Sequence, residues 1–224
     1  MFNSILWVIC LLLSFVMIVL SYKCYGKMGI FMWIIFATIV SNIQTVKLVE
    51  IFGLETALGN ILYGTTFLAT DALNLKYGEK MARKSIVLGI ATMVLVSLFM
   101  TIAIYYQPSV NDFAQESLKT IFTLNLRITI ASIIAFAISQ FNDAKLFAFL
   151  QKKYKKLWIS NNCSTIVSQI IDTVIFTTIT YIGLLPWNVI LELMLSMLAF
   201  KVIVAIFDTP FLYIINKINP KQEL

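Results

Sequence analysis

The sequence predicts an all-α integral membrane protein, a polytopic bundle of about seven transmembrane helices. Hydrophobic residues make up 60% of the 224 positions and charged residues only 12%, against about 25% charged residues in soluble domains. Apolar runs near 20 residues, the length that a helix needs to cross a bilayer, recur along the whole chain. These observations place the body of the protein in a membrane.

Seven apolar segments are predicted to span the membrane, at 3–22, 28–46, 55–75, 85–107, 121–145, 162–184 and 187–214. The first resembles a signal peptide in length, but no basic residue precedes it and no small-residue cleavage motif follows it. We therefore interpret residues 1–27 as an additional N-terminal transmembrane helix, residues 28–216 as a six-helix core and residues 217–224 as a cytoplasmic tail.

The distribution of basic residues predicts the orientation. With the N-terminus outside, the inner loops at 23–27, 76–84 and 145–156 and the tail from residue 215 hold 13 of the 17 Lys and Arg residues. The outer loops hold Lys47 and Lys119. The positive-inside rule then predicts an N-out, C-in topology. This reading explains the net charge of +6 without a nucleic-acid partner, the alternative being a nucleic-acid or anionic-lipid patch at 152–156.

One polar phrase occurs twice, on two consecutive apolar segments. The pattern Ser-Gln-x-x-Asp-x-x-x-Phe begins at Ser139 and returns 29 positions later at Ser168. On a helix, Ser and Asp four positions apart share a face, and an Asp near the middle of a membrane costs roughly 2.5–3.5 kcal/mol. Two matched copies of so costly a phrase predict two walls of one site.

Further polar residues lie inside other predicted spans. Asp71 belongs to the polar third span, where it binds a ligand or pairs with a nearby cytoplasmic cation such as Lys76 or Arg83. Asp143 has the same two readings, with lysines 145 and 152 as the alternative partners. Lys201, near the middle of the seventh span, is expected to be the partner that Asp172 requires, and it also shares a helix face with Asp208, seven residues further on. Whether a Lys201–Asp208 pair is structural or functional stays open.

The predicted site combines these residues. We expect substrate binding by Asp71, Gln140, Asp143, Gln169, Asp172 and Lys201, supported by Asn74, Arg127, Ser139, Ser168, Phe176 and Asp208. Histidine is absent and the three cysteines are dispersed, so we predict no metal site, no catalytic residue and no cofactor. Carboxylates and amides suit recognition: an Asp accepts two adjacent N–H donors of a nucleobase, and nearby aromatic rings stack on it.

At these residues the sequence resembles the queuosine precursor transporter family, a group of vitamin-uptake-transporter-like integral membrane proteins. The resemblance covers about residues 30–215 and rests on Thr70-Asp71, Tyr77-Gly78, Ala82-Arg83, Arg127, both Ser-Gln-x-x-Asp phrases, and Phe200-Lys201 with Pro210. It implies multi-pass uptake, across a bacterial inner membrane, of 7-deazaguanines such as cyano-deazaguanine, aminomethyl-deazaguanine or queuine. It matches the family's polar positions to Asp71, Gln140, Asp143, Gln169 and Asp172.

Two other functions stay open at this point. One is the substrate-binding subunit of an ATP-driven (ECF-type) vitamin importer, which would dock on separate ATPase and coupling subunits. The other is an intramembrane enzyme, which the absence of histidine and of an activated nucleophile disfavours. The expected partners are a small-molecule nucleobase and the lipid bilayer, without nucleic acid. Energy coupling, the preferred deazaguanine and homo-oligomer formation are left open.

Overall fold

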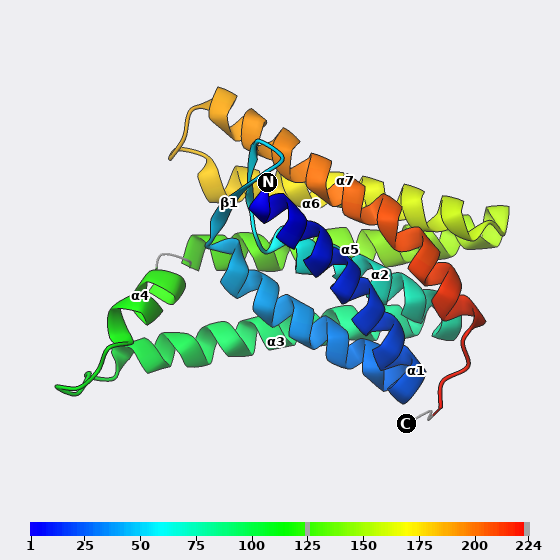
Figure 1. Cartoon of the computed structure of the whole chain (residues 1–224), viewed down its shortest axis with the longest axis horizontal. Coiled ribbons are helices and arrows are strands. Elements are labelled where there is room, and N and C mark those ends of the chain that lie inside the picture. The colour runs from blue at the N-terminus through cyan, green and yellow to red at the C-terminus, as the bar shows by residue number, and fades with distance from the viewer. Residues whose placement is uncertain (124–125, 222–224) are drawn as a thin grey trace.

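The computed structural model describes residues 1–123 and 126–221, and it confirms the all-α class (Figure 1). The helices are α1 Phe2–Thr45, α2 Asn60–Tyr77, α3 Glu79–Tyr105, α4 Gln115–Thr123, α5 Leu126–Tyr154, α6 Leu157–Tyr181 and α7 Trp187–Lys217. Two short strands, β1 Leu48–Ile51 and β2 Leu54–Ala57, form an antiparallel hairpin between α1 and α2. Residues 222–224 of the predicted tail lie outside the described residues.

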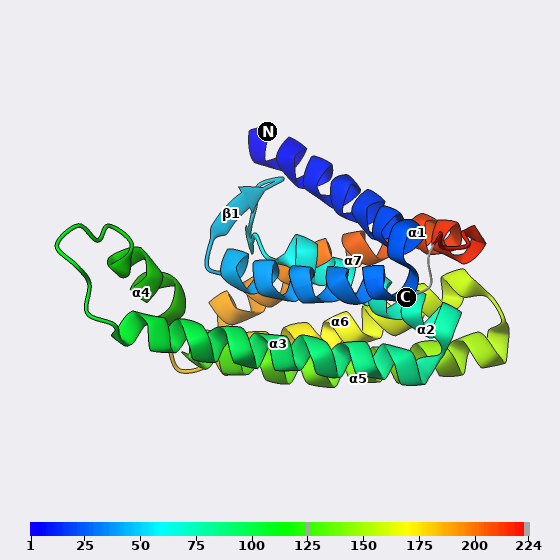
Figure 2. The ribbon, with the colours of Figure 1, turned by 90° about the horizontal axis from the view of Figure 1, so that it is seen from below.

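Helix α1 consists of two arms that meet at a sharp bend. Gly26, with φ 56° and ψ −135°, has a backbone conformation that side chains disfavour. The arms approach so closely that a Cβ on Gly29 would lie 2.0 Å from the carbonyl oxygen of Ser21. Figure 2 shows the arms diverging from this bend toward the β-hairpin. They correspond to the predicted first and second spans, 3–22 and 28–46.

Helix α2 lies in the middle of the bundle. It packs against α1, α3, α5 and α7, and 14 of its 18 residues are buried. Gly64 allows the close approach of α7, because a Cβ there would lie 2.8 Å from the Val204 side chain. By length and composition, α1, α3, α5, α6 and α7 suit a membrane span, whereas α2 is more polar and is sheltered by them. The predicted third span, 55–75, starts too early, because the hairpin extends to Ala57.

The β-hairpin contacts the first residues of α1 and the first half of α7. Its two-residue loop, Phe52-Gly53, has positive φ at both positions, as a tight hairpin of this handedness requires. The side chain of Asn3 donates a hydrogen bond to the Glu50 carbonyl, and Ser196 of α7 donates to that of Glu55. The hairpin therefore connects the start of α1 with α7.

Two predicted loops are much shorter than expected. The segment 145–156 was expected to be a loop, but α5 continues to Tyr154 and α6 begins at Leu157. Lysines favour helix and extend their charges away from apolar surface, so a basic segment continues a transmembrane helix readily. Likewise, the predicted loop 76–84 reduces to Gly78, which has φ 83° between α2 and α3. Helix α4 begins in the segment between the predicted spans 85–107 and 121–145, which were expected to be joined by a loop.

Candidate functional site

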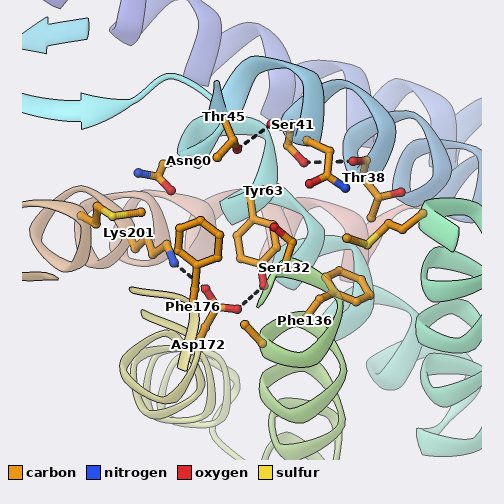
Figure 3. Close-up of a pocket in the computed structure, with 14 residues that line it drawn as sticks. Thr38, Ser41, Thr45, Asn60, Tyr63, Ser132, Phe136, Asp172, Phe176 and Lys201 are labelled. Carbon is orange, nitrogen blue, oxygen red and sulfur yellow. Dashed lines mark hydrogen bonds and ion pairs between the residues drawn. The ribbon is translucent and has the colours of Figure 1, made fainter. Parts of the chain in front are cut away.

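A buried ion pair between α6 and α7 forms the centre of the candidate site. The Nζ atom of Lys201 lies 2.5 Å from Oδ2 of Asp172, and both side chains are almost fully shielded, with 2% and 4% exposed. The other carboxylate oxygen accepts hydrogen bonds from the hydroxyl of Tyr63 on α2 and, at 3.2 Å, from that of Ser139 on α5. Residues of four helices therefore meet at this carboxylate, and Figure 3 shows Tyr63 and Lys201 beside Asp172. The expectation that Lys201 is the partner of Asp172 is confirmed.

Lys201 is held by more than its charge. It donates a hydrogen bond of 3.1 Å to Thr173 and lies 5.2 Å from the centre of the Tyr63 ring. The Lys201–Asp208 pair that the sequence also suggested is wrong. Asp208 instead accepts a hydrogen bond of 2.6 Å from Asn161, because seven residues of helix place it about 10 Å along the axis from Lys201.

A pocket opens beside this ion pair. In this structure the pocket is narrow, with a cavity volume of about 30 Å³. Figure 3 shows Phe176 and Tyr63 side by side above Asp172, with Phe136 further along the same wall. The lining residues are Thr38, Ser41, Asn42, Thr45, Asn60, Tyr63, Met93, Ser132, Ala135, Phe136, Asp172, Phe176, Met197 and Lys201. The pocket thus combines a charged floor, aromatic walls and a polar roof.

The polar roof was missed in the sequence-based site. It comes from the second arm of α1, where Thr38, Ser41, Asn42 and Thr45 line the pocket. Their spacing of three, four and seven positions is that of one helix face, so the signal was present in the sequence. The hydroxyls of Thr38, Ser41 and Thr45 donate to backbone carbonyls of their own helix. The amide of Asn42 lines the pocket on the same helix face.

A second polar centre lies deeper in the bundle. The carboxyl groups of Asp71 on α2 and Asp143 on α5 lie within hydrogen-bonding reach of each other, and Asp208 on α7 acts on both. All three side chains are fully buried. The hydroxyl of Thr165 on α6 lies 3.4 Å from Asp71. We call Asp71, Asp143 and Asp208 the acid cluster; none of them lines the pocket.

The cationic partners suggested for two of these acids are wrong. Lys76 donates instead to the carbonyl oxygens of Asn216 and Ile218, at 2.8 and 3.2 Å. Arg83 forms its ion pair with Glu79. In the described part of the chain, neither Asp71 nor Asp143 has a salt bridge to any lysine or arginine.

The two Ser-Gln-x-x-Asp phrases face each other on α5 and α6. These antiparallel helices are joined by a turn of two residues and pack more extensively than any other pair. Ser139 of the first phrase donates to Asp172 of the second, and Ser168 of the second stands beside Asp143 of the first. Each serine thus lies next to the acid of the other phrase, and Ser139 donates a hydrogen bond to its neighbour. The repeat divides between two centres: Asp172 lies at the pocket, and Asp143 lies in the acid cluster.

The two glutamines lie between these centres. Gln140 donates a hydrogen bond of 2.8 Å to Thr66 of α2. Gln169 is fully buried, yet neither its amide nitrogen nor its amide oxygen has a hydrogen-bond partner within residues 1–123 and 126–221. The structure therefore does not place either glutamine against the pocket, and their contact with substrate stays a prediction.

The remaining supporting residues hold helices together. Asn74 donates to the carbonyl of Ala144 at 2.7 Å, which joins α2 to α5. Arg127 donates to the carbonyls of Ile179 and Ile182 at 2.5 and 2.6 Å, which closes the last turn of α6. Asn142 donates to Ser168 at 3.0 Å and joins the two phrases.

The described residues contain no group of three or more His, Cys, Asp or Glu side chains arranged to hold a metal ion. The chemistry of both centres is thus that of carboxylates, amides, hydroxyls and one ammonium group. Such groups bind and orient a polar solute or hold protons.

Comparison with known proteins gives two matches. Residues 57–215 match a family model described as "Putative vitamin uptake transporter". Over 226 aligned residues the chain is 39% identical to the "Probable queuosine precursor transporter" of Bacillus subtilis (strain 168), an alignment that covers 100% of the chain and 99% of that protein. No solved structure matches the chain.

Proposed function

The chain belongs to the vitamin uptake transporter family, and from this membership we propose that it carries a queuosine precursor into a bacterial cell. The relative with that name aligns along its whole length, and five long apolar helices suit a multi-pass membrane protein. The family assignment is that of a transporter rather than an enzyme. The comparisons give no support to a binding subunit of an ATP-driven importer.

The observation that carries the proposed site is the Asp172 carboxylate at the floor of an aromatic pocket. A buried carboxylate offers two acceptor oxygens to a pair of adjacent N–H donors, which is the hydrogen-bonding edge of a guanine-like base. Substrate donors would take over the positions now held by Lys201 and the Tyr63 hydroxyl. The Phe176 and Tyr63 rings would cover the faces of a planar ring system.

The polar roof complements this edge. Asn42 and Asn60 bring amide groups, each of which donates and accepts, to the side of the pocket formed by α1 and the start of α2. Mixed donor and acceptor edges are read well by such amides. A site of this kind between helices is typical of secondary transporters. We therefore propose a 7-deazaguanine as the substrate, with Asp172, Lys201, Tyr63 and Phe176 in direct contact with it.

The test is uptake in a bacterium that neither makes deazaguanines nor has an importer of its own. Cells expressing the chain would receive nanomolar cyano-deazaguanine, aminomethyl-deazaguanine or queuine, and queuosine in their tRNA would be measured. We expect native protein to restore queuosine and Asp172→Asn to abolish it. The matched control is Asp112→Asn, which changes an exposed acid that caps α4. Failure of every precursor, with the protein in the membrane, would contradict the proposal.

The N-out, C-in orientation is part of the same proposal. In a background with the three native cysteines replaced by serine, Val110→Cys in the loop before α4 should react with a membrane-impermeant thiol reagent added to whole cells. Lys221→Cys, beyond α7, should react only after the cells are opened. The reverse pattern would overturn the orientation.

A further inference from the structure

We propose that the acid cluster binds the proton that drives transport, so that substrate entry is coupled to proton entry. This inference rests on the proposed function and adds its coupling ion. In each cycle one carboxylate of the cluster takes up a proton from the outer side, becomes a neutral carboxylic acid, and releases the same proton to the inner side.

The first observation is the set of unpartnered acceptors in the cluster. Asp71 Oδ1, both carboxyl oxygens of Asp143 and Asp208 Oδ2 are buried and accept no hydrogen bond from any donor in the described residues. A buried ionised carboxylate without donors is costly. Two carboxyl groups in hydrogen-bonding reach, as Asp71 and Asp143 are, relieve that cost by sharing a proton.

The second observation is an amide aimed into the cluster. Asn161 of α6 is fully buried and is fixed by its Nδ2, which donates to Asp208 at 2.6 Å and to Thr209 at 3.1 Å. Its Oδ1, on the same amide group, has no hydrogen-bond partner in the described residues. A buried acceptor of this kind requires a donor, and a protonated carboxyl group of the cluster is a suitable one.

No basic group of the packed helices neutralises the cluster in the described part of the chain. The charged groups that act on its carboxyls are one another, from α2, α5 and α7, and α6 contributes amide and hydroxyl groups. The nearby cations are engaged elsewhere: Lys201 with Asp172, Lys76 with carbonyls at the end of α7, and Arg83 of α3 with Glu79. Among the residues that the structure describes, no charged group of α1 or α3 acts on the cluster.

The cluster is linked to the pocket through three shared helices. Helix α2 carries Asp71 and the pocket residue Tyr63, eight positions apart, and α5 carries Asp143 and Ser139, four apart. Helix α7 carries Asp208 and Lys201, seven apart. Spacings of four, seven and eight residues all fall within one broad face of a helix, so both residues of a pair lie on the same side.

These shared helices provide the coupling. The three groups that hold Asp172, namely Tyr63, Ser139 and Lys201, lie on the helices α2, α5 and α7 that also carry the cluster. We expect the packing of these helices to change when the cluster gains or loses a charge. On α6, the buried face runs from Asn161 through Thr165 and the unpartnered Gln169 to Asp172. A proton in the cluster therefore favours one arrangement of these helices around the pocket, and its release favours the other.

The experiment uses the purified full chain in lipid vesicles with a labelled precursor that passed the cell assay. Exchange is measured first, with unlabelled precursor inside, labelled precursor outside and equal pH on both sides. Accumulation is measured next, with vesicles acidic outside and empty of precursor, with and without a protonophore. The variants are Asp143→Asn and Asp71→Asn, with Asp112→Asn as the exposed-acid control.

We expect native protein to exchange the precursor and to accumulate it at least several-fold above equilibrium, with the protonophore abolishing accumulation. In Asp143→Asn or Asp71→Asn, exchange should persist and accumulation should fall to the equilibrium level. Exchange without pH-driven accumulation in native protein would overturn the proton coupling and leave the transport function intact. Loss of exchange in a folded Asp143→Asn would overturn it in favour of direct substrate contact. Absence of exchange in native protein would refute the transport function itself.

Discussion

Replacing Lys201 with methionine tests whether the buried ion pair organises the pocket. The substitution keeps the length and apolar stem of the side chain but removes the ammonium group from Asp172 Oδ2 and Thr173. Asp172 then retains only hydroxyl donors, from Tyr63 and Ser139, in a site where 4% of its side chain is exposed. Removing one partner of a buried pair costs about 3–5 kcal/mol, so we expect a loss of stability of this size.

The double variant separates the pair from its surroundings. Asp172→Asn alone leaves a buried ammonium group with the Thr173 hydroxyl and the Tyr63 ring, which is costly for the same reason. Lys201→Met combined with Asp172→Asn removes both charges, so the double variant should be more stable than the sum of the single losses implies. We expect an interaction free energy between the two substitutions of about 1–3 kcal/mol.

The assay is reversible unfolding of the purified protein in mixed micelles, followed by helix content as the share of denaturing detergent rises. Lys119→Met, at an exposed position before α5, is the matched control and should stay within about 0.5 kcal/mol of native protein. Additive losses, within about 0.5 kcal/mol, would refute the claim that the two charges stabilise each other.

Three further predictions concern single features. Tyr63→Phe keeps the aromatic wall but removes the donor to Asp172, and since hydrogen bonds to charged groups contribute about 1.5–3 kcal/mol, the precursor concentration for half-maximal uptake should change at least several-fold; an unchanged value would contradict the site. Gly29→Ala forces a Cβ against the Ser21 carbonyl and should destabilise the protein by about 1–3 kcal/mol in the micelle assay, unless the arms of α1 do not meet as described. Arg127→Gln removes charged donors from the last carbonyls of α6 and should lower stability by about 1–2 kcal/mol without changing precursor affinity; a changed affinity would bring Arg127 back into the site.

The membrane class and the central ion pair could be predicted because their physical signals are local. An acid and a lysine deep inside apolar segments must each find a partner, and Asp172 and Lys201 were the two that lay nearest the middle of their spans. The pairing of Asp71 and Asp143 could not be predicted in this way. It depends on α2 packing inside the bundle, which brings two acids together away from the cytoplasmic cations that their sequence neighbourhoods offered.

The polar roof was missed for a different reason. Thr38, Ser41, Asn42 and Thr45 are uncharged, and three of them satisfy their hydroxyls on their own helix, so no single residue appears costly. The only signal for a site is that all four residues lie on the same face of one helix. The β-hairpin was missed because its residues 54–57 continue into an apolar segment, and composition alone does not separate the strand from the helix that follows.

Because the two Ser-Gln-x-x-Asp phrases run in opposite directions on α5 and α6, their acids lie at different depths in the membrane. Gln140 and Gln169 are the middle residues of their helices, and each acid lies three residues beyond its glutamine, in opposite directions. If the two midpoints are level, Asp172 and Asp143 differ in depth by about 9 Å, roughly a third of a 30 Å hydrocarbon core. A positive charge passing between them crosses that share of the membrane voltage, about 0.7 kcal/mol per 100 mV. With the proposed N-out, C-in orientation and proton coupling, uptake by this protein should therefore quicken when the cell interior becomes more negative.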